Sequence, residues 1–197
     1  MKVLITGCFG FIGYNFLKYL DENYHSDFNI IGIDSLITKT SKLNKIEFKN
    51  SDNFKFYNID INEINSIDEK SIDLIINFAA ESHVDNSITN PNKFIKTNVM
   101  GTNEVLKFAY KNNIDNFIHI STDEVYGSNQ ESFSLESDSL DPSSPYSASK
   151  ASAEMICNAF IKTYGMNIII CRPANNYGQY QQPEKLIPYS IANLLSG

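Results

Sequence analysis

The sequence predicts an α/β fold: a doubly wound parallel sheet with helices on both faces. Three observations predict it. Six short segments are almost continuously apolar and β-branched, which is typical of strands buried on both faces of a parallel sheet. Helix-patterned segments alternate with them, and strand–helix–strand alternation implies right-handed crossovers. A glycine-rich turn follows the first of these strands directly.

The elements can be placed along the chain in order. The predicted strands are Lys2–Thr6, Asn29–Ile33, Phe54–Ile59, Asp73–Phe78, Asn116–Ile120 and Asn167–Cys171. The predicted helices are Phe11–Asn23, Asn92–Asn112, Tyr146–Thr163 and Glu184–Leu195. Short helical or looped pieces are expected between the second and fourth strands. The stretch Ser128–Pro145 is rich in Ser, Asp, Glu and Pro and is expected to cross the surface.

Length and composition predict one globular domain, residues 1–197. The net charge is −7 and the basic residues are scattered, which argues against a nucleic-acid partner. No apolar run approaches membrane-spanning length, and the start of the chain lacks the pattern of a secretory leader. The three cysteines are odd in number and far apart, which argues against a disulfide framework. We therefore expect a cytoplasmic protein without a membrane partner.

The glycine-rich turn has the spacing of a dinucleotide-binding loop. Gly7 permits a tight turn, Gly10 lets the backbone approach a pyrophosphate, and Gly13 allows the helix to pack closely. The N-terminus of the following helix then offers free N–H groups to phosphates. This pattern makes the predicted fold Rossmann-like. The alternative interpretation is a plain tight turn between a strand and a helix.

Asp34 ends the second strand, about 20 residues beyond Gly13, where a carboxylate would accept both hydroxyls of an adenine ribose. The same carboxylate would repel a 2′-phosphate, so the sequence favours NAD over NADP. The alternative is that Asp34 is only a turn residue at the end of a strand.

Tyr146 and Lys150 stand four residues apart, so they share one face of the predicted helix. A tyrosine of pKa near 10 is a poor base at neutral pH. We expect an ammonium from Lys150 and a positive nicotinamide ring to lower the pKa of Tyr146. Lys150 would also bind the nicotinamide ribose. The alternative is that both side chains merely lie on a solvated helix face.

Thr122, Asp123 and Glu124 follow the apolar strand Asn116–Ile120, and ligands of such sheets bind at the carboxyl ends of strands. Thr122 can hydrogen-bond a sugar hydroxyl at the reacting carbon. The two carboxyl groups exceed what a hydride-transferring enzyme needs. The alternative is that both only terminate a strand or cap a turn.

With these motifs, the chain resembles an extended short-chain dehydrogenase, and more closely the dTDP-glucose 4,6-dehydratase family with its UDP-glucose relatives. The resemblance covers essentially all 197 residues. Beyond the glycine loop it rests on five segments: Ala79–Asp85, Ser121–Gly127, Ser144–Lys150, Asn175–Gly178 and Pro183–Pro188. Generic epimerases of the superfamily keep the tyrosine and the lysine but lack the Asp-Glu pair.

The resemblance implies a role for each catalytic residue in the conversion of a nucleotide-linked glucose to its 4-keto-6-deoxy form. Tyr146 takes the C4 hydroxyl proton while NAD accepts the C4 hydride, assisted by Thr122 and Lys150. Glu124 removes the C5 proton, and Asp123 protonates the C6 oxygen, which leaves as water. The hydride then returns to C6.

The resemblance also implies contacts with ligands. Cofactor contacts are expected from Gly7, Gly10, Phe11, Ile12, Gly13, Asp34, Ser35, Leu36, Thr38, Asp60, Ile61, Phe78, Ala79, Ala80, Ser82, Thr97, Tyr146, Lys150 and Asn176. Substrate contacts are expected from Ser82, Thr122, Asn175, Lys185 and Leu186. No metal ligands are implied, and the two long helices would pair subunits in a four-helix homodimer interface.

The chain departs from the family in three places. Cys8 and Phe9 occupy loop positions that are usually small, and Arg172-Pro173-Ala174 precedes the Asn pair where the dTDP enzymes commonly differ. A C-terminal substrate-binding lobe is expected in this family and is largely missing from these 197 residues. The alternatives that stay open are a UDP-glucose 4,6-dehydratase, a nucleotide-sugar epimerase or decarboxylase, and an NAD-binding module without turnover.

Overall fold

Six parallel strands form one sheet in the computed structural model, which describes residues 1–48, 52–128 and 133–196. Their order in space is β3-β2-β1-β4-β5-β6, so the chain starts at the centre, builds one edge and then crosses to build the other. The strands are β1 (Lys2–Thr6), β2 (Asn29–Ile33), β3 (Phe54–Tyr57), β4 (Leu74–Asn77), β5 (Asn116–Ile120) and β6 (Asn167–Cys171). The predicted doubly wound parallel fold is confirmed.

Two strands are shorter than predicted. β3 lies at the edge of the sheet, and its pairing with β2 ends where Tyr57 meets Ile33, so the backbone beyond Tyr57 leaves the ladder. β4 loses one residue at each end, although Asp73 and Phe78 still donate backbone hydrogen bonds to β1. A difference of one residue at each end of β4 is within the range by which assignments of element ends vary.

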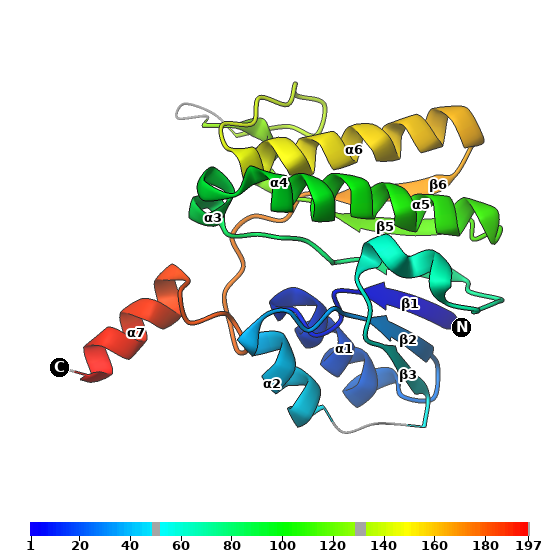
Figure 1. The fold of residues 1–197 in the computed structure, drawn as a ribbon, viewed down its shortest axis with the longest axis horizontal. Helices are drawn as coiled ribbons and strands as arrows, with labels where there is room; N and C mark the ends of the chain where they lie inside the picture. Colours follow the sequence, from blue (N-terminus) through cyan, green and yellow to red (C-terminus); the bar gives the residue numbers. More distant parts are fainter. Residues whose placement is uncertain (49–51, 129–132, 197) are drawn as a thin grey trace.

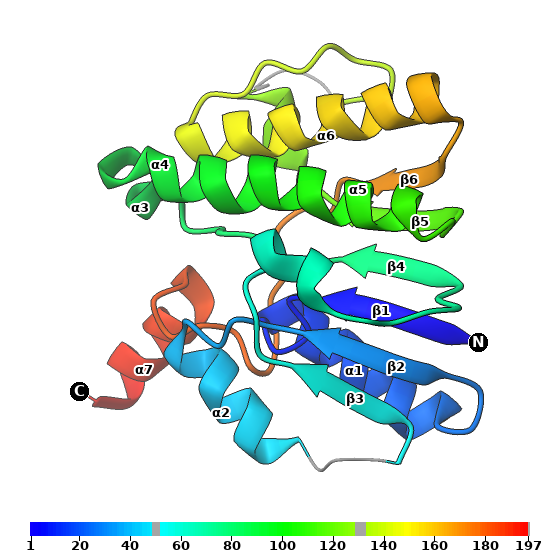
Figure 2. The same ribbon diagram turned by 45° about the vertical axis from the view of Figure 1, so that its right-hand side comes forward.

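Helices cover both faces of the sheet, and Figure 2 shows α5 and α6 in front of β5 and β6 and α1 behind β2 and β3. The α-helices are α1 (Phe11–Tyr24), α2 (Lys39–Glu47), α3 (Val84–Thr89), α4 (Pro91–Phe94), α5 (Thr102–Lys111), α6 (Pro145–Tyr164) and α7 (Leu186–Ser196). Two 3₁₀ turns, η1 (Ile61–Ser66) and η3 (Asp123–Tyr126), and a π-helical segment, η2 (Ile95–Gly101), complete the elements.

The predicted helix Asn92–Asn112 is therefore a composite of α4, η2 and α5. The wider π turn carries Asn98, whose buried amide donates to the carbonyl of Glu81 (3.0 Å) and to the hydroxyl of Ser149 on α6 (2.8 Å). Apolar periodicity averages over such a turn and predicts one continuous helix.

The two hydrophobic cores follow from the alternation of side chains along each strand. On β1, Val3 and Ile5 face the side where Leu17 of α1 packs, whereas Leu4 faces the opposite side. There Leu4 belongs to the core that also contains Leu106 of α5.

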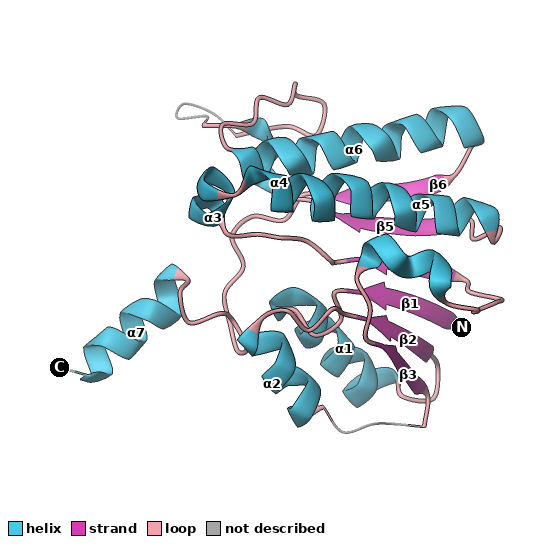
Figure 3. Ribbon diagram, in the orientation of Figure 1, coloured by secondary structure: helices cyan, strands magenta, loops and turns pink. Residues whose placement is uncertain are grey.

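Loops gather at the carboxyl edge of the sheet, and Figure 3 shows the segment after β6 crossing this edge before α7 begins. The side chain of Asn15 on α1 donates to the carbonyl of Gln179 (3.0 Å), which fixes the crossing segment above the first helix. None of the residues of α7 is buried. Within the described residues, no helix is both long enough and apolar enough to cross a lipid bilayer.

We predict that Leu106→Ala destabilises the protein by about 2–5 kcal/mol, because Leu106 is fully buried and its loss leaves a cavity between α5 and the sheet. The neighbouring Lys107→Ala is the control, since its exposed ion pair with Glu104 contributes at most about 1 kcal/mol. Denaturant unfolding of both variants checks this, and equal costs would contradict the placement of α5 on the core.

Candidate active site

A cleft follows the carboxyl edge of the sheet, where ligands bind in folds of this class. It consists of two adjoining hollows. One faces the ends of β5 and β6, and the other faces the ends of β2 and β3. Both hollows are lined by Gly7, Gly10, Phe78, Ala80, Ser82 and Gln182.

The glycine loop forms the floor of the cleft. Gly7 has a φ of 65°, and a Cβ there would come within 2.7 Å of the backbone nitrogen of Ala79. A Cβ on Gly13 would collide with the carbonyl of Gly7, so these two positions accept only glycine. No side chain caps the first turn of α1, which leaves its N–H groups available to an anion.

Asp34 fastens this loop to the end of β2. One carboxylate oxygen accepts the N–H of Phe9 (3.0 Å) and the other accepts the N–H of Leu36 (2.8 Å). Burial raises the pKa of Asp34, and these backbone hydrogen bonds partly offset that rise. Asp34 therefore faces the cleft and also stabilises the turn at the end of β2. The alternative interpretation, in which Asp34 is a turn residue, is thus correct in part.

The second hollow contains most of the other predicted cofactor residues: Ser35, Thr38, Asp60, Ile61, Ala79 and Thr97. Leu36 does not line either hollow. Asp60 also caps η1 by accepting the N–H of Asn62 (2.9 Å). The hollow has further lining residues that the sequence did not predict: Ile37, Ser41, His83, Asn86, Lys93 and Glu184.

The first hollow brings together the N-terminal part of α6 and the end of β5. It is lined by Thr122, Glu124, Tyr146 and Lys150, together with the predicted residues Phe11, Ile12 and Gly13. Ser144 and Ser147 form a reciprocal capping box at the start of α6, and Pro145 takes the first helical position. The ammonium of Lys150 donates to the carbonyl of Ile120 (2.6 Å), which ties α6 to β5.

Burial dominates the electrostatics of Tyr146 and Lys150. It raises the pKa of Tyr146 to about 12, although a hydrogen bond from Thr122 lowers it, and the charges of Glu124 and Asp123 raise it further. Burial lowers the pKa of Lys150 to about 8. The expected lowering of the tyrosine pKa is thus not found in the protein alone, because burial of the phenol raises it most and the two nearby carboxylates raise it further. The ammonium of Lys150 is directed at a backbone carbonyl.

The two acidic residues of η3 have different surroundings. Glu124 lines the first hollow, and both burial and the charge of Asp123 raise its pKa, with Lys185 lowering it. Asp123 instead lines a neighbouring hollow beside Tyr126 and Arg172, and one of its carboxylate oxygens lies 3.3 Å from the Thr122 hydroxyl.

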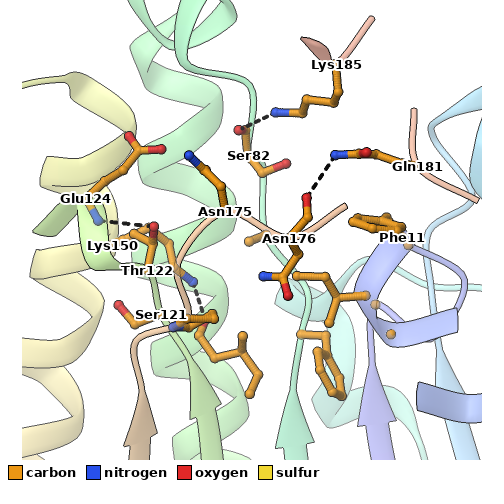
Figure 4. A pocket seen from close by; sticks show the side chains of 18 of the residues that line it. Phe11, Ser82, Ser121, Thr122, Glu124, Lys150, Asn175, Asn176, Gln181 and Lys185 are labelled. Carbon is orange, nitrogen blue, oxygen red and sulfur yellow. Dashed lines mark hydrogen bonds between the residues drawn. The ribbon is translucent and has the colours of Figure 1, made fainter. Parts of the chain in front are cut away.

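The segment after β6 closes the cleft from above. In Figure 4, Asn175 and Asn176 lie between Glu124 on one side and Phe11 on the other. Lys185 donates to the carbonyl of Ser82 (3.2 Å), and Gln181 donates to the carbonyl of Asn176 (3.1 Å). Of the predicted substrate residues, Leu186 alone is outside the cleft, with 79% of its surface exposed.

The sequence missed several lining residues of the first hollow: Ile120, Ser121, Pro173, Ala174, Gln181 and Gln182. Ile120, Ser121, Pro173 and Ala174 lie within two residues of a predicted site residue, and Gln181 and Gln182 lie between the motif segments Asn175–Gly178 and Pro183–Pro188. Proximity to a motif was therefore the signal that could have found them. Within the described ranges no cluster of His, Cys, Asp and Glu has the arrangement of a metal site.

Comparison with known proteins identifies the family. The sequence model of the family described as GDP-mannose 4,6 dehydratase matches residues 4–197. The low-salt glycan biosynthesis protein Agl12 of Haloferax volcanii is 42% identical over 199 residues, which cover 100% of this chain and 64% of that protein. The match therefore spans less than two thirds of the relative's length.

The solved structures that are similar over the whole chain include a dehydratase and an epimerase. DesIV, a dTDP-glucose 4,6-dehydratase from Streptomyces venezuelae solved with NAD and TYD bound, is 40% identical with a TM-score of 0.92. UDP-glucuronic acid 4-epimerase from Bacillus cereus, solved with UDP-glucuronic acid and NAD, is 29% identical with a TM-score of 0.88. This chain covers 63% of each. With its motifs, its fold and a family model matched almost from end to end, the chain belongs to the family described as GDP-mannose 4,6 dehydratase, and it is also similar in sequence and structure to dTDP-glucose 4,6-dehydratases.

Proposed function

We propose that the full-length protein is an NAD-dependent dTDP-glucose 4,6-dehydratase, a hydro-lyase that forms the 4-keto-6-deoxy sugar nucleotide. The observation that carries the proposal is that Glu124 lines the same hollow as Thr122, Tyr146 and Lys150. A carboxylate beside the tyrosine gives the site a base for C–H removal that an oxidation alone does not need. The similarity to DesIV supports the nucleotide-sugar substrate.

The residues of the cleft fit a dinucleotide. The bare backbone at Gly7 and Gly13 and the uncapped first turn of α1 would accept a pyrophosphate, and Asp34 would accept ribose hydroxyls. The carboxylate of Asp34 disfavours a 2′-phosphate, which supports NAD over NADP. Bound NAD would take up a hydride from C4 of the sugar and return it to C6.

Tyr146 would take the proton of the C4 hydroxyl, with Thr122 hydrogen-bonded to the same oxygen. A phenol whose pKa is about 12 lies ~5 pH units above neutrality, so its ionisation requires about 7 kcal/mol of electrostatic help. Lys150 holds an ammonium on the same face of α6, and the positive ring of an oxidised nicotinamide would add a second charge of the required sign. Tyr146 would therefore act as a base only when the cofactor is bound.

Glu124 and Asp123 would divide the water loss. Oxidation at C4 acidifies the C5–H bond, so Glu124 removes that proton, and its raised pKa makes it a stronger base than an exposed glutamate. Asp123 would protonate the C6 oxygen as it leaves. In the structure the carboxyl of Asp123 lies in the neighbouring hollow and contacts the Thr122 hydroxyl (3.3 Å), so this role would require its side chain to turn toward the cleft.

The remaining expectations concern the whole protein. We propose that residues 1–197 form its NAD-binding catalytic domain and that a C-terminal lobe completes the substrate site. Ser82, Asn175 and Lys185 would contact the sugar nucleotide within the cleft, whereas Leu186 lies outside it. A homodimer would use the exposed apolar side chains along α5, η2 and α6: Ile95, Met100, Tyr110, Met155 and Tyr164. The full-length protein would be located in the cytoplasm.

The proposal is tested by incubating the full-length protein and NAD separately with dTDP-glucose, UDP-glucose and GDP-mannose. A 4-keto-6-deoxy product absorbs strongly in alkali, whereas an epimerised hexose does not. We expect this product from dTDP-glucose, and from UDP-glucose if the base is not discriminated. An epimer would favour the epimerase alternative, and NAD binding without any product would favour a module without turnover.

We predict that Tyr146→Phe slows oxidation at C4 by roughly 10²–10⁴-fold, because no base remains for the hydroxyl proton. The NADH formed in a single turnover measures this step directly. Wild-type NADH formation in this variant would exclude Tyr146 as the base.

We predict that Glu124→Gln permits oxidation at C4 but blocks water loss, because the amide cannot accept the C5 proton. The variant should accumulate NADH, and it should not exchange the C5 hydrogen with deuterated water. Exchange at the wild-type rate would refute the role of Glu124.

The raised pKa of Glu124 predicts where the rate of C5–H exchange falls on the acid side of its pH profile. A base must be unprotonated, so the rate falls as the pH drops through this pKa, which lies above that of an exposed glutamate. Asp123→Asn removes the negative charge that raises the pKa of Glu124, so this fall in rate should move to lower pH. A fall that stays at the same pH would contradict this coupling.

A further inference from the structure

A buried ion pair lies outside the cleft, next to η3, the acidic turn that carries Asp123 and Glu124. Arg172, the first residue after β6, donates from Nε to both carboxylate oxygens of Glu154 (3.1 Å each) and from Nη2 to one of them (2.7 Å). The side chain of Glu154 is fully buried and that of Arg172 is 18% exposed. Buried charges are costly unless they are fully paired, and this pair has the bidentate geometry that such pairing requires.

The other edge of the same guanidinium holds η3. Its Nη1 donates to the hydroxyl of Tyr126 (2.6 Å) and to the carbonyl of Glu136 (3.1 Å), and the guanidinium carbon lies 4.9 Å from the centre of the Tyr126 ring. Tyr126 is the last residue of η3, two positions after Glu124. One side chain thereby joins the end of β6, helix α6 and the turn that carries both acids.

Glu154 continues a row of contacts along α6. It follows Lys150 by four residues and Tyr146 by eight, so all three lie on one helix face. Tyr146 reaches Thr122, Lys150 reaches the carbonyl of Ile120, and Glu154 reaches the far end of the turn through Arg172. The turn is thus held against α6 at both its ends.

We propose that Arg172, fixed by Glu154 and Tyr126, is a positioning residue that keeps Glu124 in the cleft for the removal of the C5 proton. This inference rests on the proposed function. Its chemistry requires an arginine, because a planar fork with donors on both edges serves three partners, whereas a lysine offers a single point charge.

The start of the turn has support that does not depend on Arg172's side chain. The N–H of Ser121 donates to the carbonyl of Cys171 (2.7 Å), and the N–H of Asp123 donates to that of Pro173 (3.1 Å). Thr122 therefore stays beside Tyr146 when the contact with Tyr126 is lost. Loosening this contact should impair water loss more than oxidation at C4.

Tyr126→Phe tests the proposal, since it deletes one hydroxyl and leaves the ion pair intact. In the full-length enzyme with NAD and dTDP-glucose, we expect product formation to fall by roughly 10-fold, because a small misplacement of a catalytic group is costly. KM should change by less than about 2-fold, and NADH should accumulate during turnover, as predicted for Glu124→Gln. Arg172→Lys should accumulate more NADH than Tyr126→Phe does. It is the replacement test of the proposal if Tyr126→Phe does not fold.

Tyr19→Phe is the matched control, because this exposed tyrosine of α1 lies on the other face of the sheet. It should leave both the rate and the NADH level unchanged. The proposal is overturned if Tyr126→Phe and Arg172→Lys slow both steps equally, or slow neither, in an enzyme whose wild-type form makes the product. A wild-type protein that makes no 4-keto-6-deoxy product would instead overturn the proposed function itself, and this inference with it.

Discussion

The contact between one face of α6 and the end of β5 is the constraint on which the site depends. Side chains spaced four residues apart along this face reach Thr122, the carbonyl of Ile120 and Arg172. A helix can hold such a row only in one rotation and one register. The same packing that seals the core under α6 therefore also sets the distance between the phenol of Tyr146 and the acidic turn.

Burial makes this arrangement electrostatically demanding. Removing Tyr146, Lys150 and Glu124 from water disfavours the charged form of each, so the tyrosine pKa rises and the lysine pKa falls. Without a cofactor, Tyr146 therefore stays protonated at neutral pH and cannot take a proton from a hydroxyl. A cationic ligand in the adjoining dinucleotide cleft would reverse this balance, which links the two hollows in function as well as in space.

The fold could be predicted from the sequence because its strands are continuous apolar runs and its first turn is marked by glycines that no other residue can replace. The end of β3 at Tyr57 depends on its pairing with β2, so it could not be predicted from the local sequence, although the start at Phe54 was predicted correctly. The π turn at Ile95–Gly101 could not be predicted, because its amide contacts join residues far apart in the chain.

The candidate site likewise has features that the sequence predicts and features that it does not. Motif residues such as Thr122, Glu124 and Tyr146 meet in one hollow as expected, since the carboxyl ends of parallel strands share an edge. The separate surroundings of Asp123, the exposure of Leu186 and the buried pair of Arg172 with Glu154 were not foreseen. Each follows from the packing of elements that are distant in sequence, and burial, which a sequence does not give, fixes the pKa of Tyr146.

We propose that one cleft of the full-length protein oxidises a hexose at C4 and returns the same hydride to C6 after water is lost. dTDP-glucose carrying deuterium at C4 tests it most directly, with the product isolated and the label located by NMR. We predict that the deuterium is found at C6 of the 4-keto-6-deoxy sugar. Deuterium retained at C4 of a hexose, or a product in which C6 keeps its hydroxyl, would contradict it.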